Sequence, residues 1–212
     1  MKTFYYRHRP HIQPPGAVIF VTFRLYGSLP KKVLNDLYEE YEWLKKIIKN
    51  VDYRNKREIL RHYNMQKRLL VKYDNCLHNS KTGPHFLKIP EIAKLVAEEI
   101  EYFDGKKYDL LSYCVMSNHS HTVFKPLKIR EGEYHSLERI MHSIKSYTAT
   151  EANKILSRKG KKFWTMESFD HYCRSEAETI KIIEYVLNNP VKAGLASKPD
   201  DWEWSYIKEN VR

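Results

Sequence analysis

Two neighbouring stretches, DLLSYCVM (109–116) and HSHTVFKP (119–126), constrain the fold more than any other part of the chain. Both contain residues that favour strands, and only Ser117 and Asn118 separate them. A two-residue connection between two strands predicts a tight antiparallel hairpin. We therefore expect an antiparallel sheet with this hairpin inside it and with two histidines at the start of the second strand.

The other elements follow from the spacing of apolar residues. AVIFVTFRL (17–25) predicts a buried strand, and SFDHYCR (168–174) predicts a short one. Helices are expected at 89–103, at 136–156 and from Ser175 to about Asn188, where Asn189-Pro190 closes the last helix. The order β-α-β-β-α-β predicts an α+β fold, the ferredoxin-like split arrangement of an antiparallel sheet with packed helices. Residues 1–15 are basic, aromatic and proline-containing, and we expect an irregular arm there.

A segment at about 30–78 interrupts this order after the first strand. Apolar residues recur at helical spacing from Lys31, and again over 55–73, so we expect an inserted helical hairpin within one domain that spans 1–212. Residues 44–72 hold ten basic side chains against two acidic ones. Such a run fits either a surface that follows phosphates or an ordinary solvated helix face.

The charge of the whole chain indicates the class of its partner. Lys and Arg outnumber Asp and Glu by 37 to 26, a formal net charge of +11, which favours nucleic acid first and anionic membrane second. Sixteen tyrosines and four tryptophans offer faces on which unpaired bases can stack. The three separated cysteines fit neither a disulfide framework nor a zinc motif, and no signal peptide or membrane span is evident. We expect a cytoplasmic protein that does not enter the membrane.

The motif Asn118-His-Ser-His-Thr is the first candidate for chemistry. Residues i and i+2 of a strand lie on one face, so His119 and His121 are expected to point the same way. Two imidazoles on one face can clamp a metal ion or act as an acid/base pair. Taken alone, the pattern fits unconnected histidines better than a metal site, and no third ligand is evident from the spacing of the other histidines.

The last predicted helix carries the second candidate. Its apolar residues Thr179, Ile182, Ile183, Val186 and Leu187 share one arc, and Tyr185 lies outside that arc with Asn189 one turn later. A surface tyrosine would also satisfy this placement. A hydroxyl nucleophile, a metal clamp and a basic surface are together the components of phosphodiester transfer.

Four blocks in order resemble one family: YCVMSNHSHTVFKP, SIKSYTATEANKIL, FWTMESFDHYCR and EYVLNNPVKAGL, with DWEWSY at the end. The chain resembles the single-tyrosine HUH transposases (HUH denotes two histidines that flank a hydrophobic residue) of the transposase IS200-like class. Within that class it is most similar to the REP-associated tyrosine transposases. The resemblance covers about residues 5–207, with 30–78 as a variable insertion.

The resemblance implies roles for particular residues. His119, His121 and Asn189 would hold Mg²⁺ or Mn²⁺, and Tyr185 would be the nucleophile. The DNA-contacting groups would lie on the N-terminal arm, on the 157–164 loop and near the fourth strand: Arg7, Arg9, Lys145, Arg158, Lys159, Lys161, Lys162, His171 and Arg174. One residue departs from the family pattern, because Ser120 stands where a bulky hydrophobic residue normally points into the core.

The implied activity is cleavage and rejoining of single-stranded or hairpin DNA by a monomer or a homodimer. With the cation on the scissile phosphate, the tyrosine attacks, a 5′-phosphotyrosine link forms, and a 3′-hydroxyl is released that can reverse the step at a new junction. Three alternatives remain open: a domesticated DNA-binding protein of this fold without cleavage activity, a metal-dependent hydrolase in which water attacks the phosphodiester, and a purely structural basic protein.

Overall fold

The computed structural model describes residues 4–6, 10–12, 14–49 and 56–211. It divides the chain into two compact units, one made of residues 1–26 with 85–212 and the other of residues 27–84. That the whole chain acts as one domain with an insertion stays a prediction.

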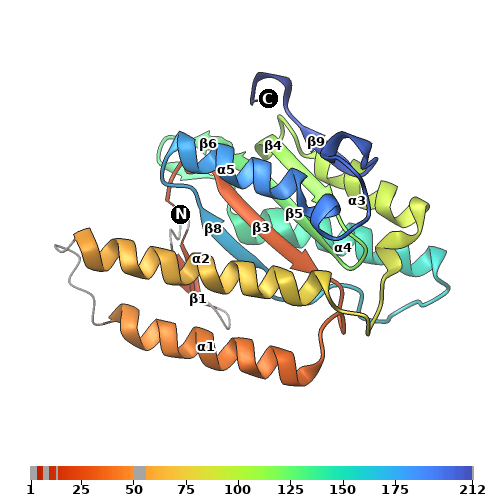
Figure 1. The fold of residues 1–212 in the computed structure, drawn as a ribbon. Coiled ribbons are helices and arrows are strands. Elements are labelled where there is room, and N and C mark those ends of the chain that lie inside the picture. The colour runs from red at the N-terminus through yellow and green to blue at the C-terminus, as the bar shows by residue number, and fades with distance from the viewer. Residues whose placement is uncertain (1–3, 7–9, 13, 50–55, 212) are drawn as a thin grey trace. The chain divides into compact units, whose positions relative to one another are not determined.

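The first unit is built on a five-stranded antiparallel sheet with strand order β8-β3-β5-β4-β9 (Figure 1). The strands are β3 (Ile19–Arg24), β4 (Tyr108–Val115), β5 (His119–Pro126), β8 (Phe169–Tyr172) and β9 (Ser205–Ile207). The β4–β5 hairpin forms as predicted, and β3 pairs with β5 on its other side. The α+β class is confirmed. The fifth strand, β9, was not predicted, because three residues are too few to show strand periodicity.

One face of the sheet carries the main core. Helices α3 (Pro90–Tyr102) and α4 (Leu137–Ile155) pack there through residues such as Ile100 and Ile144. The sheet contributes Phe23 and Phe124 among others, and the Tyr108 and Phe124 rings stack with centroids 4.5 Å apart. This face is therefore filled with apolar side chains, and a polar site is expected on the opposite face.

Helix α5 (Glu176–Leu187) lies across the opposite face, where it contacts β4 and β5 (Figure 1). The Ser175 side chain caps it by accepting a hydrogen bond of 3.3 Å from the Glu178 backbone N–H, as the capping-box pattern indicates. The chain does not leave helical structure at Asn189-Pro190. It begins a further helical turn, α6 (Asn189–Lys192), in which the proline occupies the first turn, where a missing N–H costs nothing.

Several short elements of the first unit were missed at the sequence level. The arm expected to be irregular contains β1 (Phe4–Tyr6) and β2 (Pro10–Ile12), which pair with each other, so that expectation was wrong for these residues. Another two-stranded ribbon joins β6 (Lys128–Arg130) and β7 (Glu133–Tyr134). Three short 3₁₀ helices complete the unit: η1 (Phe86–Lys88), η2 (Pro199–Asp201) and η3 (Glu209–Val211). Strands this short form because a partner strand completes their hydrogen bonds, not because their own sequence shows strand periodicity.

The second unit is a helical hairpin of α1 (Lys31–Lys49) and α2 (Lys56–His78). An ion pair between Lys72 on α2 and Glu40 on α1 joins the two helices. The two ends of the unit meet at Gly27 and Gly83, where a Cβ on Gly83 would lie 2.3 Å from the Gly27 carbonyl oxygen. Gly83 also has a φ of +88°, so both its backbone conformation and its surroundings require glycine.

No helix in the described part of the chain is long and apolar enough to cross a membrane.

Candidate active site

Strand register places both histidines on the α5 face of the sheet. In the β3–β5 ladder Arg24 pairs with His119, and Thr22 pairs with His121. Directly paired residues of antiparallel strands share a face, and so do alternate residues of one strand. The prediction that His119 and His121 point the same way is therefore met by the backbone itself, and Thr22 stands beside them.

The two imidazoles converge on one point. Their Nε2 atoms are 3.0 Å apart, and the rings meet edge to face with centroids separated by 4.7 Å. The remaining nitrogens are held from outside: His119 Nδ1 lies 2.6 Å from Asn118 Oδ1, and His121 Nδ1 lies 2.9 Å from Thr22 Oγ1. Because a side-chain amide oxygen only accepts, His119 donates from Nδ1 and directs the lone pair of Nε2 toward His121.

This donor set fits a divalent cation. Two ligands at right angles, each about 2.1 Å from a common centre, are about 3.0 Å apart, which is the separation of the two Nε2 atoms. Hydrogen bonds to the outer nitrogens of metal-binding histidines fix the ring orientation in the same way as Asn118 and Thr22 do here. The two imidazoles and their supporting partners are therefore compatible with a metal clamp.

Asn189 adds a second observation that bears on the cation. Its Nδ2 donates to the Tyr185 carbonyl oxygen at 2.9 Å and to the Val186 carbonyl oxygen at 3.3 Å, so the amide orientation is fixed by the end of α5. Its Oδ1 is buried and accepts no hydrogen bond from the residues that the structure describes. A buried acceptor without a partner is costly, and cation binding would offset that cost.

Tyr185 lies beside the histidine pair. Its ring centroid is 6.2 Å from that of His121 and 6.4 Å from that of Phe20, which itself stacks on His121 at 5.6 Å. The side chain is half-buried, and the Lys192 ammonium lies 4.4 Å from its ring centroid. The tyrosine, the histidines and a cationic group are thus brought together by α5, α6 and β5.

Other tyrosines are less well placed to act with these histidines. Tyr172 pairs with Ile19, a residue of the α3/α4 core, so it belongs to the opposite face of the sheet. Tyr147 is an exposed residue of α4, which packs on that same opposite face. Of these three tyrosines, Tyr185 alone belongs to an element on the histidine face.

Ser120 points away from the site. It pairs with Phe23 and Val115, both in the α3/α4 core, and its Oγ donates to the Cys114 carbonyl oxygen at 3.2 Å. The buried hydroxyl is therefore satisfied. The departure from the family pattern changes the packing of the core face and leaves both imidazoles untouched.

The residues expected to contact DNA lie in different environments. Arg7 and Arg9 lie outside the described residues. The loop cations Lys159, Lys161 and Lys162 are exposed. This loop lies beside the end of β3, because Leu25 pairs with Trp164. The Leu25 N–H also donates to the Asn118 carbonyl oxygen at 2.9 Å, next to His119. The exposed lysines therefore lie at the histidine end of the sheet.

Two other residues predicted to contact DNA make interactions within the protein. The Lys145 ammonium lies 2.6 Å from Ser168 Oγ and 3.1 Å from the carbonyl oxygens of both Thr165 and Met166, so it holds that loop in place. The Arg158 guanidinium lies over the Phe86 ring at 4.5 Å. Their contact with DNA stays a prediction that these interactions do not favour.

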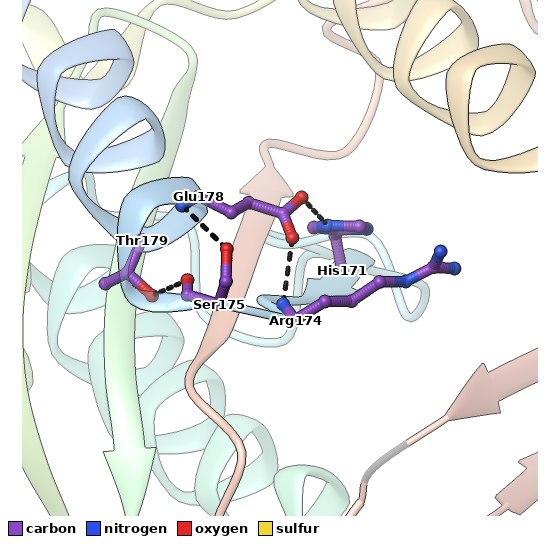
Figure 2. A network of polar contacts seen from close by, with 5 residues as sticks. All are labelled: His171, Arg174, Ser175, Glu178 and Thr179. Carbon is purple, nitrogen blue, oxygen red and sulfur yellow. Dashed lines mark hydrogen bonds and ion pairs between the residues drawn. The ribbon is translucent and has the colours of Figure 1, made fainter. Parts of the chain in front are cut away.

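His171 and Arg174 belong to a polar network at the start of α5, drawn in Figure 2. His171 Nε2 and Glu178 Oε1 are 2.9 Å apart, and the Arg174 backbone N–H donates to Glu178 Oε2 at 2.8 Å. Burial raises the pKa of Glu178, and the Arg174 hydrogen bond partly offsets that rise. The network ties β8 to the helix that carries Tyr185, whereas the Arg174 side chain itself remains exposed.

Sequence reasoning missed four contributors to the site. Thr22 and Phe20 become neighbours of His121 only through strand register, which a single sequence does not reveal. Asn118 was assigned to the turn, and its adjacency to His119 was the one signal available. Lys192 follows the Asn-Pro pair that drew attention to Tyr185, but its position over the ring depends on α6.

Comparisons with known proteins agree with this geometry. Residues 90–189 match the family model described as "Transposase IS200 like". This part of the chain is similar to that family. The matched segment includes His119, His121, Tyr185 and Asn189, and it leaves out residues 27–84.

A solved structure of a REP-associated tyrosine transposase bound to a REP hairpin is similar in fold. The TM-score is 0.52 at 15% sequence identity, and the alignment covers 95% of this chain and 81% of that chain. At this identity the likeness concerns the fold. No curated protein matches the chain.

Proposed function

We propose that this protein is a metal-dependent tyrosine transposase that cleaves and rejoins single-stranded or hairpin DNA. The observation that carries the proposal is the placement of Tyr185 beside the His119–His121 pair within the segment matched by the transposase family. The hairpin-bound structure of similar fold supports the choice of DNA as substrate. The net charge of +11 favours the same partner.

Each residue of the site has a role in this proposal. His119, His121 and the Asn189 oxygen would hold Mg²⁺ or Mn²⁺, which when bound supplies charge stabilisation at the scissile phosphate. Asn118 and Thr22 orient the imidazoles. The Tyr185 oxygen attacks phosphorus and displaces the 3′ oxygen; the phenol loses its proton, and the departing 3′ oxygen gains one. The products are a 5′-phosphotyrosine link and a free 3′-hydroxyl.

Tyr185→Phe is the decisive variant. A hairpin DNA labelled separately at its 5′ and 3′ ends is incubated with protein and Mn²⁺, and covalent adducts are resolved on a denaturing gel. We expect the wild-type adduct to carry the 3′-labelled fragment, and Tyr185→Phe to abolish it, because the phenol oxygen is removed while the ring remains. Tyr147→Phe is the matched control, since this exposed tyrosine lies on α4.

The other outcomes identify the alternatives. Two free DNA ends that still appear with Tyr185→Phe indicate hydrolysis by water. DNA binding without any cleavage indicates a domesticated binding protein. Retention of the adduct in Tyr185→Phe contradicts the assignment of the nucleophile.

A further inference from the structure

The second unit carries a strongly basic helix that the proposed chemistry does not use. Helix α2 contains six Lys and Arg residues against two acidic residues, Glu58 and Asp74. It lies outside the segment matched by the transposase family. Its charge therefore needs an explanation other than the active site.

Five exposed polar residues of α2 are arranged as a stripe. Arg57, Arg61, Asn64, Arg68 and Asn75 are all exposed. At about 100° per residue they fall within an arc of about 60°, and at 1.5 Å per residue they extend over about 27 Å. We call these five residues the α2 stripe. The first four are three or four residues apart and neighbour one another along the helix, and Asn75 follows Arg68 after two turns.

The stripe is free of carboxylates. None of its five residues is acidic, and Asp74 falls about 100° from Arg57 in the same projection and is buried. Within the described residues, Arg61 and Arg68 form no ion pair, whereas Lys72, at the edge of the stripe, is paired with Glu40. The charges of Arg61 and Arg68 are thus left for an external partner.

Two shallow hollows lie between side chains along the stripe. One shallow hollow is lined by Arg57, Arg61, Asn64 and Arg68 together with Met65. A second shares Asn64 and Arg68 and continues along the helix to Asn75 and beyond. The two hollows therefore join along the stripe, and every residue that lines them comes from α2 or directly follows it.

We propose that the α2 stripe binds the sugar-phosphate backbone of duplex DNA. All five side chains can donate hydrogen bonds, and three of them are guanidinium groups, whose geometry matches phosphate. The length of the stripe, about 27 Å, is close to one turn of duplex, about 34 Å. The inference rests on the proposed function for the identity of the polyanion and assigns the paired part of the substrate, or duplex that flanks it, to the inserted hairpin.

Two rival partners fit the stripe less well. Single strands bind through aromatic side chains on which bases stack, but Tyr73 of α2 falls on the far side of the helix from the stripe and is buried. A membrane surface requires an apolar face, and Val71 is the one exposed large hydrophobic side chain of α2 among its described residues.

The test uses the full chain and a matched control. Arg57→Gln/Arg61→Gln/Arg68→Gln removes three charges from the stripe while keeping good helix formers. Lys31→Gln/Lys32→Gln/Lys46→Gln removes three exposed charges from α1. Dissociation constants for a fluorescent hairpin DNA with a long stem, and for an unpaired strand of equal length, are measured by anisotropy at several salt concentrations.

For binding to the stem, the plot of log K against log [salt] has a negative slope. We expect the stripe variant to reduce the magnitude of that slope by about 2 to 3, since each lost phosphate contact contributes about 0.9. The control should change it by less than about 1. Equal losses in the two triple variants, or an unchanged slope in the stripe variant, would overturn the proposal. So would a stripe-dependent binding of vesicles rich in phosphatidylserine with no stripe-dependent binding of the stem.

Single variants guard against a folding defect. Arg61→Gln and Arg68→Gln are each expected to lower the slope by about 1, and circular dichroism confirms that the helices remain. The wild-type adduct assay is run on the same preparation. If the stripe variants lose stem binding but the wild type forms no adduct, the proposed chemistry is refuted and the DNA-binding role of the stripe stands. If the wild type forms the Tyr185 adduct but the stripe variants bind the stem unchanged, the chemistry stands and the role of the stripe is refuted.

Discussion

Asn118 is expected to set the affinity of the histidine pair for its cation. In Asn118→Ala the Oδ1 that lies 2.6 Å from His119 Nδ1 is removed, but the backbone carbonyl that accepts from the Leu25 N–H is kept. The change therefore acts on the imidazole more than on the hairpin. His119 loses the partner that fixes which of its nitrogens carries the hydrogen.

The size of the effect follows from two independent arguments. A buried donor left without its partner costs about 1–3 kcal/mol. Removal of a group that supports a metal-binding histidine weakens metal affinity about 10- to 100-fold, equivalent to about 1.4–2.8 kcal/mol. We therefore expect Asn118→Ala to raise the dissociation constant for Mn²⁺ by about 10- to 100-fold.

The assay is a Mn²⁺ titration of the intact protein, followed by the electron paramagnetic resonance signal of the free ion. Ser120→Ala is the matched control, because Ser120 is two residues away but points into the core on the other face. It should bind Mn²⁺ within about twofold of wild type, since its Oγ supports only the Cys114 carbonyl. Wild-type affinity in Asn118→Ala, or equal weakening in both variants, would refute the reasoning.

Two further predictions concern titratable groups. Burial raises the pKa of Glu178, so the folded state binds this proton more tightly than the unfolded state does. The stabilisation from this group is present at pH values below the ordinary glutamate pKa, and it is lost as the pH rises through the raised pKa. Glu178→Gln should flatten that fall in urea unfolding measured at several pH values, and an unchanged pH dependence would contradict it. Burial also raises the pKa of Cys114 to about 12, and the thiol is inaccessible, whereas Cys76 is half-buried with a pKa that burial likewise raises. Iodoacetamide at mildly alkaline pH should modify Cys76 before Cys114 in the native protein, as read by peptide mass spectrometry, and the opposite order would show that β4 opens.

The elements of this fold were predictable where each carries its own periodic signal. The β4–β5 hairpin, the strand around Val21 and the long helices all do so, and α2 simply extends to His78, beyond the expected 73. The three-residue strands β1, β2 and β9 carry no such signal. They exist because a neighbouring strand completes their hydrogen bonds.

The site divides in the same way. That His119 and His121 share a face follows from the two-residue repeat of a strand. That Thr22 supports His121 depends on how β3 and β5 align across 99 residues of sequence, and no local pattern encodes that register. The proximity of Tyr185 to His121 likewise depends on the packing of α5 against the sheet.

The contact between Gly27 and Gly83 has a consequence for the history of the chain. Because the two ends of the helical hairpin touch, the segment between them begins and finishes at one place and adds no span to the backbone that it interrupts. Such a segment can be lengthened, exchanged or lost without stretching the chain on either side. The sheet unit and the inserted hairpin can therefore change at separate rates during evolution.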